Sequence, residues 1–179
     1  MLSLLIACGS PSLPADTGAG SDDTGPATTT DDTGASSSGG DALVVNEFMA
    51  SNSAGITDEG GAYPDWLELY NGTSTDIALG GYLLSDDAKQ LDKHVLADMT
   101  IEAGGHLLLF ADGDVKEGDN HLSFKLARSG EEIHLTSANG VPVDSLSYGE
   151  QVTDISYARV ADGDSEWDYA AEPTPGAAN

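Results

Sequence analysis

The clearest pattern of hydrophobic and polar positions lies between residues 65 and 87. In its first six residues Leu67 and Leu69 alternate with larger or polar neighbours, which is the two-residue period of a β-strand. Asn71-Gly72 then marks a turn, and a Gly80-Gly81 pair separates two further short apolar runs. The stretch therefore predicts several short antiparallel strands joined by tight turns.

Similar runs occur on both sides of this stretch, with turns predicted at Ser129-Gly130 and Asn139-Gly140. Residues 51–64 form a polar, glycine-rich loop, and residues 89–98 have no regular pattern. Helical periodicity is nearly absent, so seven to nine short strands predict an all-β sandwich. The further strands are expected within residues 42–50, 99–110 (two strands), 124–126, 133–136, 141–146 and 155–157.

The alternation also predicts which side chains are buried. Within residues 65–70 the two leucines share one face, and Trp66, Glu68 and Tyr70 share the other. Residues 107–110 lack alternation, so that strand should be covered on both faces. The polar pair Asn46-Glu47 lies inside an apolar run and must find partners if it is buried. The expected core consists of Leu67, Leu69, Leu108, Phe110, Ile133 and Leu135.

Composition adds limits to this picture. The chain has 179 residues, 22 of them glycine, and 6% aromatic residues, which is typical of one domain with short strands and many turns. Its 31 acidic and 6 basic residues give a net charge of −25. Such a surface repels polyanions and offers few cations for counterion release, so nucleic acid is excluded as a partner.

The first eight residues have the character of a secretion signal. Leu5-Ile6-Ala7-Cys8 resembles the bacterial lipobox, in which the cysteine is lipidated, and Cys8 is the only cysteine in the chain. The apolar run is short and no basic residue precedes it, so we expect the true start codon upstream and residues 1–8 to be a truncated signal peptide. The alternative is a fortuitous apolar start of a soluble chain.

Residues 9–41 are rich in Gly, Ser, Thr and Asp, with a degenerate Asp-Thr-Gly repeat and six acids without a base. They have little apolar surface to bury, and we expect a disordered linker. Asp-Thr-Gly also occurs in aspartic proteases, where it needs a rigid turn that such a repeat does not supply. Gly9 after Cys8 is similar to lipoproteins sent to the outer membrane, so the expected location is the bacterial outer membrane or cell surface, with a lipid on Cys8 as the membrane attachment.

Several separated motifs resemble one family. Residues 65–87, the opening Asn46-Glu47-Phe48-Met49-Ala50-Ser51-Asn52 and the closing Pro173-Thr174-Pro175-Gly176 are similar to bacterial lamin tail domains. The resemblance covers residues 42–179 and implies an immunoglobulin-like β-sandwich. It departs from the family pattern at residues 94–97, where a Trp and a Phe-Pro often stand. Lamin tail domains also occur fused to hydrolases, which implies an accessory, targeting role.

Calcium is the one cofactor that the sequence suggests. Two acidic runs place several carboxylates in predicted loops, and calcium favours six to eight oxygen ligands. Neither run has the spacing of an EF-hand loop, and the alternative is that the Asp-Gly pairs form turns and the acids provide solubility. The candidate metal ligands are Asp112, Asp114, Glu117 and Asp119 in the first run, and Asp162, Asp164 and Glu166 in the second.

No catalytic arrangement is predicted, and we expect that the chain is not an enzyme. Asp65 and Glu68 point to opposite faces of one strand, so they are expected to be solvated or capping carboxylates rather than an acid–base pair. Nucleophile-elbow, zinc-protease and phosphate-loop motifs are missing from the sequence. The histidines lack ligand-like spacing and are expected to be partly exposed: His94, His106, His121 and His134.

These observations favour a lipid-anchored surface module for binding, adhesion or targeting, without catalytic activity. Its expected partners are an extracellular or envelope protein or a polysaccharide. One alternative is a small calcium-dependent hydrolase that uses the acidic loops. The other is a purely structural envelope protein.

Overall fold

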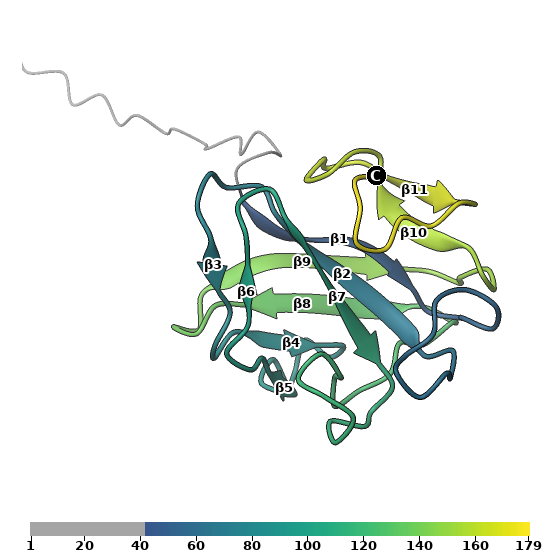
Figure 1. Cartoon of the computed structure of the whole chain (residues 1–179), viewed down its shortest axis with the longest axis horizontal. Helices are drawn as coiled ribbons and strands as arrows, with labels where there is room; N and C mark the ends of the chain where they lie inside the picture. Colours follow the sequence, from purple (N-terminus) through teal and green to yellow (C-terminus); the bar gives the residue numbers. More distant parts are fainter. Residues whose placement is uncertain (1–41) are drawn as a thin grey trace, which may run out of the picture. The chain divides into compact units, whose positions relative to one another are not determined.

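Alternating apolar residues and short glycine-containing turns give strands throughout the part of the chain that the computed structural model describes, residues 42–179 (Figure 1). The predicted signal peptide, Cys8 and the linker lie outside these residues. Within them no helix has the length and apolar composition needed to cross a membrane. The strands are β1 (Leu43–Met49), β2 (Asp65–Asn71), β3 (Ile77–Ala78), β4 (Leu83–Ser85), β5 (His94–Val95), β6 (Thr100–Ile101), β7 (His106–Ala111), β8 (Glu131–Thr136), β9 (Pro142–Tyr148), β10 (Ser156–Arg159) and β11 (Trp167–Ala170).

The strands form two larger antiparallel sheets and one small pair. The first sheet has the order β11-β10-β1-β2-β7, the second has the order β5-β4-β8-β9, and β3 pairs with β6. Figure 1 shows β2 and β7 crossing over β8 and β9, as expected for two packed layers. The predicted all-β, immunoglobulin-like sandwich is confirmed.

The main core lies between these two sheets. Leu67 and Leu69 of β2 are fully buried there, together with Ile133 and Leu135 of β8. Such burial contributes about 1.5–3 kcal/mol for each fully buried side chain. The assignment of the two β2 leucines to the core-facing side is therefore correct.

In β7 the residue that faces the main core differs by one position from the prediction. Leu67 pairs with Leu109, so Leu109 faces the main core, while Leu108 is half-buried on the opposite face. Phe110 is buried, but in a second cluster with Met49 and Trp66 on that opposite face. A continuous apolar run carries no alternation, so only the pairing with β2 determines which residues of β7 point inward.

A β-bulge in β1 brings polar residues to the outer face of the five-stranded sheet. Val45 pairs with Leu69 and Glu47 pairs with Glu68, so Asn46 is the extra residue. Val45 and Phe48 consequently face the core, and Glu47 faces the other side. Asn46, Glu47 and Glu68 are nevertheless all fully buried.

Three strand predictions differ from the structure. Residues 124–126 form no strand, although Phe124 and Leu126 are buried, because only Lys125 makes a single bridge, to Asp112. The short strands β5 and β11 were not predicted. Two to four residues are too few to show a period, and their extended conformation comes from pairing with β4 and β10.

Candidate functional site

The C-terminal segment, residues 173–179, covers the buried carboxylates of β1 and β2. Thr174 donates to Glu47 from its backbone nitrogen, at 3.1 Å from Oε1, and from Oγ1, at 3.0 Å from Oε2. The backbone nitrogen of Gly176 donates to Glu68 Oε2, and Ser156 Oγ donates to Glu47 Oε1. The expectation that Glu68 is solvated or capping is therefore wrong, because a segment distant in sequence closes over it.

Asp65 behaves differently from Glu68. Asp65 begins β2, and its Oδ1 accepts a hydrogen bond at 3.2 Å from the backbone nitrogen of Asn52 in the loop between β1 and β2, as expected for a capping carboxylate. Burial raises the pKa of Asp65 to about 6 and that of Glu68 to about 7. For Glu68 the hydrogen bond from Gly176 opposes this shift only in part.

The second predicted calcium run is used within this polar network. Asp162 Oδ1 accepts hydrogen bonds from Asn46 Nδ2 at 2.9 Å and from the Asn179 backbone nitrogen at 3.1 Å. Burial opposes ionisation of Asp162, but these hydrogen bonds outweigh it and hold its pKa below the usual range. In residues 42–179, Asp162, Asp164 and Glu166 do not form a group of three with their ligand atoms within 4.8 Å of one another.

The first predicted calcium run contributes two residues to a loop site, defined as Asp112, Glu117 and His121. His121 Nδ1 lies 2.7 Å from Asp112 Oδ2 and 3.7 Å from Glu117 Oε2. The ligand atoms of all three residues lie within 4.8 Å of one another. Asp114 and Asp119 do not belong to this group, which is the one such group in residues 42–179.

His121 is fully buried, so the expectation of a partly exposed side chain is wrong for this residue. After β7 the chain makes a loop that brings His121 into a parallel bridge with Phe110: Phe110 N donates to Asn120 O at 2.8 Å, and Leu122 N donates to Phe110 O at 2.7 Å. These bonds place the imidazole 5.2 Å from the Phe110 ring. No spacing in the sequence predicts the approach to Asp112, because it depends on the path of this loop.

A second loop reaches the same imidazole from the other side. Glu59 Oε2, in the loop between β1 and β2, lies 3.1 Å from His121 Nε2, and Glu59 Oε1 accepts from Asn120 Nδ2 at 3.3 Å. Burial disfavours the charged ring, but hydrogen bonds with Asp112 and Glu59 outweigh it and raise the pKa of His121. The loop site therefore links residues 51–64 to residues 112–121.

A hollow of about 290 Å³ adjoins the loop site, and both His94 and His121 line it. His94 is also buried, contrary to expectation, and burial lowers its pKa. Its Nδ1 accepts a hydrogen bond from the Ser123 backbone nitrogen at 3.1 Å, while its buried Nε2 has no partner in the structure. The remaining lining residues are Lys93, Val95, Ala97, Val115, Gly118, Asp119 and Ser123.

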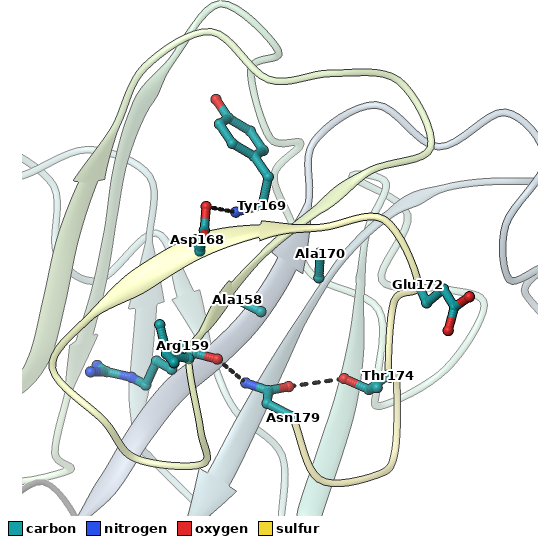
Figure 2. A pocket seen from close by; sticks show the side chains of 9 residues that line it. Ala158, Arg159, Asp168, Tyr169, Ala170, Glu172, Thr174 and Asn179 are labelled. Atoms are coloured by element: carbon teal, nitrogen blue, oxygen red, sulfur yellow. Dashed lines mark hydrogen bonds between the residues drawn. The ribbon is translucent and has the colours of Figure 1, made fainter.

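Another hollow, of about 270 Å³, lies between the β10–β11 hairpin and the C-terminal segment (Figure 2). We name it the acidic hollow, because Asp168 and Glu172 line it and are exposed. Figure 2 shows the Arg159 side chain directed away from Glu172, and its Nη2 is paired with Asp144 at 2.8 Å. Its other lining residues are Ala158, Val160, Tyr169, Ala170, Thr174 and Asn179.

The C-terminal segment also forms one wall of the acidic hollow. Asn179 Nδ2 donates to the Arg159 carbonyl oxygen at 2.9 Å, and Asn179 Oδ1 lies 2.9 Å from Thr174 Oγ1, whose single proton it shares with Glu47 Oε2 (Figure 2). Thr174, which closes over Glu47, thus also shapes this hollow. The sequence contains the closing motif at residues 173–176, but it does not predict the hollow, because the two walls of the hollow come from separate elements.

Residues 36–150 match the family model described as Lamin Tail Domain, which is more than half of the chain. Comparison with curated proteins gives no match. The structural domain continues beyond residue 150, because β10 pairs with β1 inside the five-stranded sheet. With the immunoglobulin-like sandwich and this match in agreement, the chain belongs to the lamin tail domain family.

Proposed function

We propose that this protein is a non-catalytic binding module that a lipid on Cys8 holds at the bacterial outer membrane or cell surface. The lipobox-like sequence and the polar linker support the location, and membership of the lamin tail domain family supports an accessory role. The domain would then be displayed to extracellular or envelope partners.

The acidic hollow carries the proposal of a binding role. Its two exposed acids, Asp168 and Glu172, form no ion pair among residues 42–179, and the one base in its lining, Arg159, is already paired. From residue 42 onward the chain has 25 acidic and 6 basic residues, a net charge of −19. A positively charged group is the favoured occupant, so the proposed partner is an amine-bearing polysaccharide or a basic protein segment.

The buried carboxylates support a role without catalysis. Glu47 and Glu68 are fully buried, and their oxygens accept hydrogen bonds from Thr174 and Gly176. A general acid or base must lie within hydrogen-bond reach of a substrate. In this fold the paired carboxylates serve to attach the C-terminal segment instead.

An array of glycans and envelope proteins tests the proposed binding. Residues 42–179 should retain cationic members, and the double variant Asp168→Asn/Glu172→Gln should bind them about 3- to 10-fold more weakly, as expected for two exposed ion pairs. The matched control Asp92→Asn/Glu102→Gln changes the net charge equally at exposed sites elsewhere. Equal losses in both variants would show attraction by overall charge, and a lack of any cationic ligand would refute the proposal.

The hydrolase alternative is favoured by one observation, the meeting of Asp112 and Glu117 with His121. Turnover of a phosphoester, glycoside or peptide that is lost in Asp112→Ala would establish it. If the panel gives no turnover and the array gives no ligand, a purely structural envelope role would be favoured.

A further inference from the structure

We infer that the loop site binds one divalent transition-metal ion of the zinc class, through His121 Nδ1 and one carboxylate oxygen each of Asp112 and Glu117. The inference does not depend on the proposed function. It replaces the calcium predicted for this run by an ion that accepts nitrogen as well as oxygen ligands.

The three donor atoms lie close enough together for one metal ion to bind all of them. Two ligands at about 2.0–2.2 Å from one tetrahedral ion lie about 3.4 Å apart. His121 Nδ1 is 2.7 Å from Asp112 Oδ2 and 3.7 Å from Glu117 Oε2, which brackets this value. The ligand atoms of Asp112 and Glu117 lie within 4.8 Å of each other. To form a coordination shell, Asp112 Oδ2 must move away from Nδ1 and Glu117 must move closer, which the 48% exposure of the Glu117 side chain allows.

The kinds of donor atom select the ion. Calcium is bound by six to eight oxygen atoms, whereas imidazole nitrogen with carboxylate oxygen suits zinc and its neighbours in the first transition row. Asp114 and Asp119, which would raise the number of oxygen ligands, do not join the group. The residues that the fold brings together therefore favour the zinc class over calcium.

Glu59 supplies the outer shell of such a centre. A histidine that binds a metal through one ring nitrogen usually donates the other N–H to a carboxylate, which sets the tautomer and the orientation of the ring. Glu59 Oε2 occupies that position, 3.1 Å from His121 Nε2. With Nε2–H donated to Glu59, a metal ion that displaces the proton between Nδ1 and Asp112 would meet a lone pair of Nδ1 beside Asp112 and Glu117.

His94 provides an independent observation that a ligand belongs in the adjoining hollow. Its Nδ1 accepts from the Ser123 backbone nitrogen, so in the neutral ring Nε2 carries the proton. That buried donor has no partner in the described part of the chain, which is unfavourable for a buried N–H group. An ion with three protein ligands keeps a position for water, which zinc can convert to hydroxide near neutral pH; a hydroxide in the hollow shared with His121 would give His94 its acceptor.

Titration of the metal-free protein, residues 42–179, with Zn²⁺ and Co²⁺ tests the inference. Calorimetry should show one Zn²⁺ per chain, and Co²⁺ should give the intense visible absorption of a low-coordinate site that Zn²⁺ then abolishes. Glu117→Gln should weaken Zn²⁺ binding by about tenfold or more, by analogy with the loss of a single supporting group. This variant is suitable because Glu117 is partly exposed and its loss should not prevent folding.

The chain offers a matched control in Glu132, whose side chain is 44% exposed and lies 3.0 Å from His134 Nε2. Glu132→Gln also removes an exposed carboxylate beside a histidine, but outside any three-residue group, and should bind Zn²⁺ like the wild type. The inference is overturned if stoichiometric binding is not seen, or if both variants bind Zn²⁺ equally. Displacement of Zn²⁺ by millimolar Ca²⁺, beyond the effect of NaCl at equal ionic strength, would overturn the choice of ion.

Discussion

At the scale of single residues, Glu68 shows how a distant segment can change the chemistry of a side chain. It sits on a strand whose sequence alternates regularly, yet it is fully buried on the face opposite the main core. Its hydrogen-bond donors, Asn46 and Gly176, come from a bulge and from the C-terminal segment. Burial outweighs the hydrogen bonds from these donors and raises the pKa of Glu68 to about 7.

This pKa predicts a dependence of stability on pH. Because the folded-state pKa of Glu68, about 7, lies above its ordinary value of 4.5, the folded protein binds the proton more tightly than the unfolded chain. The free energy of unfolding should therefore fall as the pH rises from about 4.5 to about 7. Ionisation of Glu68 should account for about 1–3 kcal/mol of this fall. Urea unfolding at pH 5 and pH 8 should show a smaller difference in Glu68→Gln than in the wild type. An undiminished difference in the variant would contradict the assignment.

The two faces of β7 predict unequal costs for neighbouring leucines. Leu109 is fully buried in the main core, whereas Leu108 is half-buried beside the smaller cluster. Leu109→Ala should lower the free energy of unfolding by about 2–5 kcal/mol, and Leu108→Ala should cost clearly less. Chemical denaturation of both variants measures the difference. Equal costs would mean that the register between β2 and β7 is wrong.

At the scale of elements, the C-terminal segment supplies hydrogen-bond donors to three carboxylates at the outer face of the five-stranded sheet. Removal of residues 173–179 would leave Glu47, Glu68 and Asp162 without donors from Thr174, Gly176 and Asn179. Each unsatisfied buried group costs about 1–3 kcal/mol, more when it is charged, so the shortened domain should be strongly destabilised.

Asn179→Ala is a smaller change in the same segment, and its stability should lie between those of the wild type and the truncation. It removes the side-chain bonds to the carbonyl oxygens of Asn46 and Arg159 and the bond with Thr174 Oγ1, keeps the backbone bond to Asp162, and should cost about 1–3 kcal/mol. Thermal unfolding of wild type, Asn179→Ala and the truncation should give melting temperatures in descending order. A truncation as stable as the wild type would show that the segment is not part of the folded unit.

The elements also show how far sequence reasoning reaches. Strands with clear alternation, such as β2, were predicted with the correct faces because period two is a local property. The continuous run in β7 has no such period, and its inward face depends on pairing with β2. The contacts from Thr174 to Glu47 span 127 positions, and His121 meets Glu59 across 62, so no local pattern could predict the network or the loop site.

At the scale of the whole molecule, charge predicts a dependence on ionic strength. Residues 42–179 carry a net charge of −19, and folding brings these charges closer together. Salt should therefore stabilise the domain. At pH 7, added NaCl should raise the free energy of unfolding by about 1 kcal/mol, which corresponds to a rise of about 3–5 °C in melting temperature. At pH 4 the rise should shrink, because many carboxylates are then protonated. A melting temperature that is insensitive to NaCl at pH 7 would contradict this account of the surface.

The proposed location of the whole molecule rests on its first residues and can be tested there. An apolar lead ending in Leu5-Ile6-Ala7-Cys8, a single cysteine and a polar linker together predict lipidation of Cys8. Each buried acyl methylene contributes about 0.8 kcal/mol and one chain holds only marginally, so lasting attachment requires the several acyl chains of a lipoprotein-type anchor. Expressed in bacteria behind a complete signal peptide, the protein should partition into detergent and incorporate a fatty-acid probe, whereas Cys8→Ser should do neither. If the wild type and Cys8→Ser are both soluble and unlabelled, the anchor does not exist and the domain must reach its partners without one.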